Sequence, residues 1–107
     1  MSSRIPLLAK RLKENPNDSF SKFALALELL KTNEIAKARM LFENIVKQDP
    51  DYVGIYYHLG GLYASIQENN LAISTYKKGI EIATTLQDQH AKNELMGALA
   101  TLELELL

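Results

Sequence analysis

The sequence contains an internal repeat of 34 residues, which restricts the folds open to it more than any other feature. When residues 19–52 are laid beside residues 53–86, the turns, the small residues and the aromatic rings fall at equivalent positions. The pairs that share a residue class are Leu25 and Leu59, Ala26 and Gly60, Leu29 and Tyr63, Glu34 and Glu68, Ala38 and Ala72, Phe42 and Tyr76, and Val46 and Ile80. Self-similarity at this period is typical of a solenoid, in which neighbouring units bury each other's apolar faces.

Apolar side chains recur every three or four residues through most of the chain, which predicts amphipathic helices. We expect helices at about 5–15, from near Ser19 to Lys31, from Ile35 to Gln48, from Val53 to Ile66, from Leu71 to Thr85 and at about 88–107. Segments rich in Asn, Asp and Pro separate them; Asp18 or Ser19 can cap the second helix and Asp88 the last. The sequence does not decide whether the chain stays helical between Leu86 and Gln89.

Composition excludes several classes of function. At 107 residues the chain fits one domain, residues 1–107, with a shared core. Its 12 basic and 13 acidic residues are interspersed, so we expect neither nucleic-acid nor membrane binding. The absence of cysteine is compatible with a reducing compartment. The first residues fit neither a signal peptide nor a spanning helix, so we expect a cytoplasmic protein.

The second copy of the repeat carries a specific pattern of large and small residues. Its members are Tyr56, Leu59, Gly60, Tyr63, Ala72, Tyr76 and Gly79, with Thr84 at the position of a closing proline. This pattern resembles the helix-turn-helix unit of the tetratricopeptide repeat family. The first copy has matching residues at Leu25, Ala26, Leu29, Ala38, Phe42 and Pro50. It departs from the pattern at Lys22, where an aromatic residue is usual, and at Ile45, where a small residue is.

The resemblance implies an all-α fold, a right-handed helical-repeat solenoid. It would contain two full repeats, 19–52 and 53–86, flanked by an N-terminal half-repeat helix and a C-terminal capping helix. Leu8, Leu12 and Pro16 fit the second half of a preceding repeat. The last helix lies where a further first helix would, and flanking half-repeats are expected to cover the apolar faces of the outer repeats.

Two adjacent glycines, Gly60 and Gly61, lie inside the helix predicted at Val53 to Ile66. Each costs a helix about 1 kcal/mol relative to alanine, which predicts a packing reason for them. We expect the close approach of another backbone at this point, with Tyr63 and Tyr76 filling the volume between layers.

No pattern of residues indicates catalysis. His58 and His90 are the only histidines, and their spacing does not place two metal ligands on one helical face. Motifs for a serine nucleophile or a phosphate-binding glycine loop are missing from the sequence. We therefore expect no enzyme activity, no cofactor and no metal. We expect His58 beside the groove or between helices, and His90 in solvent.

The resemblance further implies a concave groove lined by the first helix of each repeat, where a peptide or helix of a partner protein would bind. The groove positions are Phe20, Phe23, Leu27, Leu30, Lys31, Tyr57, His58, Gly61, Ala64 and Ser65. Alternatively, Phe23 and Leu27 are covered by the N-terminal helix or by the long last helix. The lysine and asparagine clamp of chaperone-tail adaptors is replaced here by Phe23, Leu27, Tyr57 and Gly61. An apolar or aromatic ligand surface is more consistent with these residues.

The last helix suggests a second function. One stripe, formed by Leu95, Leu99, Leu102 and Leu106, can pack on the body of the protein. A second apolar edge, formed by Met96, Ala100, Leu104 and Leu107, lies on another side. The alternative to peptide binding is thus a structural subunit that forms homodimers through Met96, Leu104 and Leu107, although fraying of the last turn accounts for the same residues.

Overall fold

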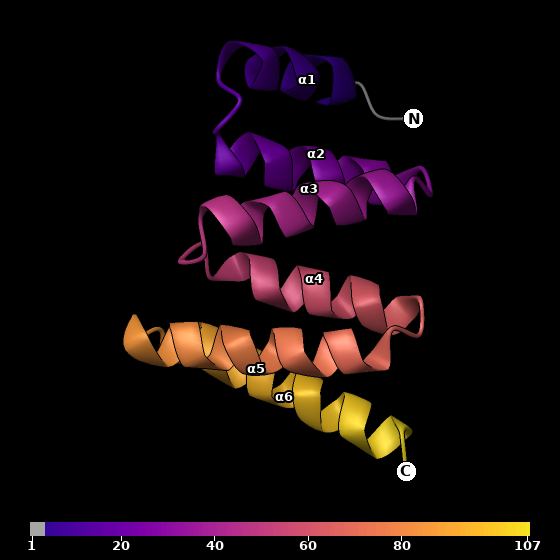
Figure 1. Ribbon diagram of the computed structural model, residues 1–107, viewed down its shortest axis with the longest axis vertical. Helices are drawn as coiled ribbons and strands as arrows, with labels where there is room; N and C mark the ends of the chain where they lie inside the picture. Colours follow the sequence, from indigo (N-terminus) through magenta and orange to yellow (C-terminus); the bar gives the residue numbers. More distant parts are fainter. Residues whose placement is uncertain (1–3) are drawn as a thin grey trace. The chain divides into compact units, whose positions relative to one another are not determined.

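The computed structural model describes residues 4–107 and contains six α-helices in that range (Figure 1). They are α1 (Arg4–Glu14), α2 (Ser19–Lys31), α3 (Ile35–Gln48), α4 (Gly54–Ser65), α5 (Asn69–Thr85) and α6 (Gln89–Glu105). The predicted all-α fold is confirmed. The helix boundaries agree with the prediction to within one or two residues. The point left open is also decided, because α5 and α6 are separate helices.

The helices form two units, and the chain passes from one unit to the next between Tyr52 and Val53. In the first unit, α1 packs on α2 and α2 packs on α3. In the second unit, α4 packs on α5, and α6 packs on both of them. The helices within each unit run back and forth along the chain order (Figure 1). The junction coincides with the boundary between the two 34-residue copies in the sequence.

Three turns share one backbone geometry. Asn33, Gln67 and Gln87 all have positive φ angles, of 62°, 62° and 59°. In each turn the following residue donates its backbone N–H to a carbonyl five residues back, as Glu68 does to Tyr63 at 2.9 Å. These are Schellman caps, in which glycine usually occupies the left-handed position. The turn before α6 therefore has the same geometry as the turns inside the two repeats.

Aspartates cap two of the helices, as the sequence predicted. Asp18 accepts hydrogen bonds from the Ser21 backbone N at 3.3 Å and from its Oγ at 2.7 Å. These bonds lower the pKa of the Asp18 carboxyl below its usual 3.8, because they stabilise the charged form. Asp88 accepts a bond from the Ala91 backbone N at 3.0 Å. Both carboxylates satisfy N–H groups that the first helical turn leaves free.

Two charged side chains of α2 are buried. Lys22 is only 7% exposed, and its Nζ donates to Asn44 Oδ1 at 2.6 Å and to Gln48 Oε1 at 2.7 Å on α3. Glu28 is 5% exposed and pairs with Arg4 of α1 at 3.6 Å. Lys22 therefore takes the place of the usual aromatic residue and is still buried. Its aliphatic stem packs as an apolar residue would, and its ammonium group donates hydrogen bonds to the neighbouring helix.

The glycines of the second unit differ from the prediction in what they contact. A methyl group placed on Gly60 would lie 2.6 Å from Cδ1 of Tyr76, so the ring of that tyrosine, rather than another backbone, makes the close approach. The same group on Gly79 would lie 2.5 Å from the Tyr56 Cβ and 2.9 Å from the Leu95 Cδ1. On Gly61 it would come no nearer than 3.8 Å, to the hydroxyl of Tyr76. Only Gly60 of the adjacent pair is required by packing.

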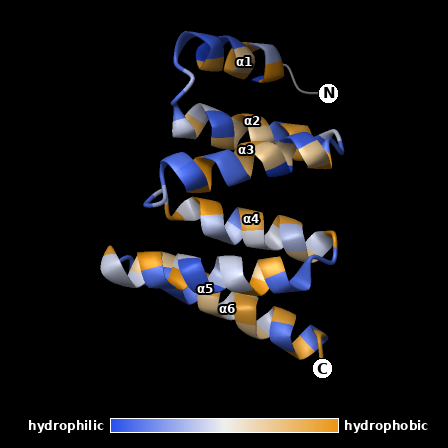
Figure 2. Cartoon of the chain, viewed as in Figure 1, coloured by the Kyte–Doolittle hydropathy of each residue, from blue (hydrophilic) through white to orange (hydrophobic). Residues whose placement is uncertain are grey.

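The last helix buries part of the predicted stripe. Leu95 and Leu102 are buried and Leu99 is half-buried, but Leu106 is exposed because it lies beyond the end of α6. Its inclusion in the packed stripe was wrong. Hydrophobic residues are also visible along α6 as far as the C-terminal end (Figure 2).

Candidate functional site

The second unit contains an open pocket of about 870 Å³ between α4, α5 and α6. Two of the predicted groove residues line it, Tyr57 and Ala64 of α4. The turn into α5 and α5 itself contribute Gln67, Asn69 and Tyr76. The remaining lining residues belong to α6 and its end, and they are Asn93, Glu94, Gly97, Ala98, Thr101, Leu102, Glu105 and Leu106.

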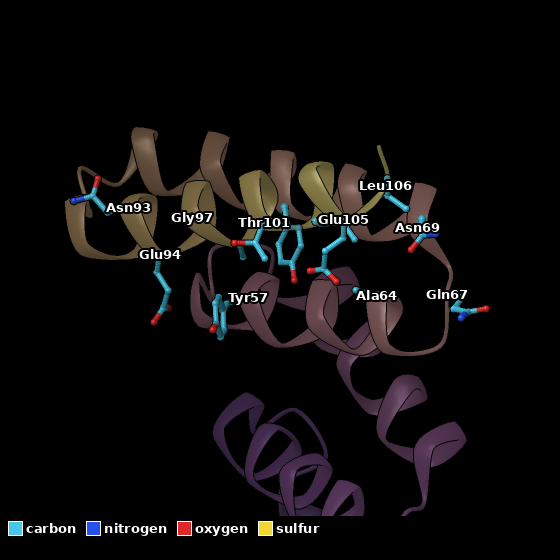
Figure 3. Close-up of a pocket in the computed structure, with 13 residues that line it drawn as sticks. Tyr57, Ala64, Gln67, Asn69, Asn93, Glu94, Gly97, Thr101, Glu105 and Leu106 are labelled. Atoms are coloured by element: carbon cyan, nitrogen blue, oxygen red, sulfur yellow. The ribbon is translucent and has the colours of Figure 1, made fainter.

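One face of α6 forms a wall of this pocket. Glu94, Gly97 or Ala98, Thr101 and Glu105 recur at spacings of three and four, so they project from the same side of the helix. Glu94, Thr101 and Glu105 extend from α6 toward α4 (Figure 3). A methyl group placed on Gly97 would meet no atom within 4 Å, which shows that this wall borders open space.

This wall was not predicted from the sequence, because the last helix was interpreted only through its stripes of leucine residues. A signal was present in the spacing of Glu94, Thr101 and Glu105, which form a polar face at helical periodicity apart from Leu95 and Leu102. The pocket lining is also more polar than the apolar or aromatic surface that was expected.

Two tyrosines give the pocket its aromatic character. Tyr57 is 39% exposed, and its ring meets the His58 ring edge-on at 5.5 Å. Tyr76 is buried apart from its contribution to the pocket. Burial raises the pKa of the Tyr76 phenol, and the nearby Tyr57 and Glu105 raise it further, because all three disfavour a phenolate. Tyr76 therefore offers a hydroxyl, not a charge.

His58 is half-buried next to Tyr57. Burial lowers its pKa below the usual 6.5, and the negative charge of Glu94 partly offsets this shift. The imidazole is therefore neutral at pH 7 and contributes no positive charge to the neighbourhood of the pocket. Neither His58, Gly61 nor Ser65 is among the lining residues; the Ser65 hydroxyl donates to the Leu62 carbonyl at 2.7 Å.

The groove residues predicted in the first repeat belong to the other unit. Phe20 and Lys31 are exposed, and Leu27 and Leu30 are half-buried. The Phe23 ring lies 6.0 Å from that of Phe42 and 5.8 Å from that of Tyr52, so it packs within its own repeat. The binding of a peptide by these residues of the first repeat stays a prediction.

The described residues offer no arrangement for metal chemistry. Within residues 4–107 there is no group of three or more His, Cys, Asp or Glu side chains placed to hold a metal ion. None of the helices described in Figure 1 is both long enough and apolar enough to cross a membrane.

Comparisons with known proteins give a consistent result. A family model described as the tetratricopeptide repeat matches residues 53–85. The crystal structure of a tetratricopeptide repeat domain protein from Salinibacter ruber is 45% identical, with a TM-score of 0.77, and the match covers 80% of this chain and 96% of that chain. A solution NMR structure of such a domain protein from the same organism is 45% identical, with a TM-score of 0.80 and coverage of 83% and 90%.

A more distant structure shares the fold alone. The crystal structure of MamA is 19% identical, with a TM-score of 0.68, and the match covers 92% of this chain and 64% of that chain. A comparison with curated proteins gives no match.

Proposed function

The chain belongs to the tetratricopeptide repeat family, whose domains are generally non-catalytic protein–protein interaction modules, and we propose that the pocket between α4 and α6 receives an extended segment of a partner protein. The observation that carries this proposal is the open volume of about 870 Å³ beside small side chains, Ala64, Gly97 and Ala98. Small residues let the backbone of a bound segment approach the helices closely.

The dimensions of the pocket fit such a segment. The polar face of α6 runs from Glu94 to Glu105, which lie eleven residues apart, or about 16 Å at the rise of an α-helix. An extended chain covers this distance in about five residues. Side chains that donate and accept hydrogen bonds, among them Asn69, Asn93 and Thr101, line the path and can bind the backbone of the segment.

Two exposed glycines provide a matched test. Neither Gly97, in the pocket wall, nor Gly54, at the start of α4, has an atom within 4 Å of an added methyl group. Gly97→Phe fills the pocket, whereas Gly54→Phe adds the same ring outside the pocket lining. Peptide binders are selected from a displayed library of random twelve-residue peptides, and their affinities for both variants are measured by calorimetry.

We expect Gly97→Phe to weaken binding about tenfold or more, since the segment loses its place against α6, and Gly54→Phe to leave it unchanged. Equal binding by both variants, or a library that yields no binder, would contradict the proposal. Both variants should unfold at or above the wild-type temperature, because replacing an exposed helical glycine does not weaken a helix.

A second candidate function is self-association through α6. Met96, Leu104 and Leu107 are 49%, 69% and 100% exposed, so the apolar edge predicted from the sequence has no cover within the described chain. Such an edge is typical of a contact between proteins. Light scattering of the wild type against Met96→Lys with Leu104→Lys tests it, because a dimer should become a monomer. A wild-type monomer at high concentration would exclude this function.

A further inference from the structure

Two carboxylates of α6, Glu94 and Glu105, face the pocket. Glu94 and Glu105 both line it, and neither forms an ion pair or a hydrogen bond with another residue in the described range 4–107. They lie eleven positions apart, about three helical turns, so they project from one face of α6. Glu94 lies near Tyr57 toward one end of the pocket, and Glu105 lies toward the other end (Figure 3).

No positively charged side chain lines the pocket beside Glu94 and Glu105. The lining contains no lysine, arginine or histidine. Residues 53–107 as a whole carry three basic side chains, Lys77, Lys78 and Lys92, against six acidic ones. Like charges gathered in a concave site without counter-charges attract a ligand of the opposite sign.

The other polar groups suit a cationic side chain as well. The exposed ring of Tyr57 lies at the same end of the pocket as Glu94, and an aromatic face next to a carboxylate attracts ammonium and guanidinium groups. The carbonyl oxygen of the Gln67 side chain and the hydroxyl of Thr101 can accept hydrogen bonds from such groups, and Asn93 Oδ1, which already accepts one from Gln89 Nε2 at 2.8 Å, can accept a second. An acidic segment would instead meet two carboxylates that nothing neutralises.

We propose that the pocket selects a basic segment of the partner protein, in which arginine or lysine side chains pair with Glu94 and Glu105. This inference rests on the peptide-binding role proposed above. The separation of the two carboxylates sets the register: the two cationic residues stand about four or six positions apart in an extended segment, because each extended residue covers about 3.3 Å and only side chains an even number of positions apart face the same side. Tyr57 packs against the cation that Glu94 binds.

The test uses the library-selected peptides that lose affinity for Gly97→Phe, since these occupy the pocket. Each arginine of such a peptide is replaced by citrulline, which has nearly the same shape but no charge, and lysine by norleucine. Affinity is measured by calorimetry at low and at high salt. The protein variants are Glu94→Gln and Glu105→Gln, and the matched control is Glu103→Gln, which removes an equal charge from an exposed position of α6 that does not line the pocket.

We expect the selected peptides to be rich in arginine and lysine, and each pocket variant to weaken binding about two- to fivefold, as exposed ion pairs do. Glu103→Gln should leave the affinity within about twofold of wild type, because Glu103 is exposed and does not line the pocket, so that solvent and salt screen its charge from the peptide. Citrulline in the peptide should have no effect on binding to the double variant Glu94→Gln with Glu105→Gln, whose partner charges are already gone.

The outcomes separate this inference from the function on which it rests. Peptides that need an open pocket but lack basic residues, or that bind Glu94→Gln and Glu105→Gln as tightly as wild type, would overturn the basic segment and leave peptide binding intact. Equal losses for Glu103→Gln would also overturn it, because the effect would then come from net charge alone. Peptides indifferent to Gly97→Phe would overturn the pocket itself.

Discussion

The two repeats follow the same helical plan but differ in the volume of equivalent side chains. Leu27 and Leu30 of α2 correspond, 34 positions later, to Gly61 and Ala64 of α4. The first pair is bulky and half-buried, whereas Ala64 lines an open pocket. The comparison teaches that the repeat pattern specifies the helix crossing, while the residues between the pattern positions decide whether space for a ligand remains.

The helix crossing inside each repeat involves a small residue of the first helix and an aromatic residue of the second, but the two residues differ between the repeats. Ala26 and Phe42 of the first repeat are completely buried, and Gly60 and Tyr76 take their positions in the second. Removing one methyl group makes room for the Tyr76 ring, which brings its hydroxyl group toward Gly61. The second repeat thereby gains a polar group on the pocket side that the first repeat lacks.

The largest effect is expected when the second crossing is overpacked. Gly60→Leu should lower the free energy of unfolding by about 1 to 3 kcal/mol, because its side chain cannot fit beside the Tyr76 ring. Gly97→Leu, which enters open space, is the control and should not lower it. Chemical denaturation measures both. If Gly60→Leu is as stable as wild type, the crossing is not the close contact described here.

The first repeat should depend on its buried lysine. Lys22→Ala should cost about 1 to 2 kcal/mol, because it removes the packed stem and two hydrogen bonds of a charged group. Lys22→Met restores the stem and should recover part of that loss. The exposed Lys47→Ala serves as control. If Lys22→Ala loses no more unfolding free energy than the control, the hydrogen bonds to Asn44 and Gln48 do not stabilise the first repeat.

The turns allow a stabilising change. Gln67→Gly should raise the free energy of unfolding by about 0.5 to 1 kcal/mol, because glycine adopts the left-handed conformation without steric cost. Asn33→Gly should gain less, since asparagine tolerates this conformation better than glutamine. Thermal unfolding compares the two variants. If Gln67→Gly is less stable than wild type, the contacts of the Gln67 side chain contribute more stability than its positive φ angle costs.

The smallest effect concerns pH. The pKa of His58 in the folded state lies below its usual 6.5, so the unfolded chain takes up the proton first on acidification. Stability from the neutral imidazole is complete above about pH 6.5 and declines as the pH falls from there toward the folded pKa. His58→Gln should remove this decline between pH 7.5 and 5.5, and His90→Gln, at an exposed site, is the control. Parallel stability curves for wild type and His58→Gln would contradict the account.

The fold was predictable because its determinants are local and repeated. Spacing of apolar residues located the six helices, and Asp18 and Asp88 marked two helix starts. The break before α6 was left open because Gln87 occupies a position where glycine would have been a clear signal. Leu106 was placed in the packed stripe because helical periodicity does not show where a helix ends, and α6 ends one residue earlier, at Glu105.

The lining of the candidate site was predictable only in part. Tyr57 and Ala64 were identified from their place in the repeat, and both line the pocket. Glu94, Thr101 and Glu105 were missed because the last helix does not keep the register of the repeat pattern, so their position against α4 depends on tertiary packing. The reason for Gly60 was predicted only in part: Tyr76 was expected to fill space between the layers, but the close approach to Gly60 was expected from another backbone and not from the Tyr76 ring itself.

The most direct test of the account is a map of amide chemical shifts during titration with a pocket-selected peptide. Nitrogen-15-labelled wild-type protein is observed by NMR. The account predicts that the largest changes occur at Ala64 on α4 and at Gly97, Ala98 and Thr101 on α6, while Leu27 and Leu30 on α2 change little. Changes centred on α2, or spread evenly over both repeats, would contradict the claim that small side chains confine the ligand site to the second repeat.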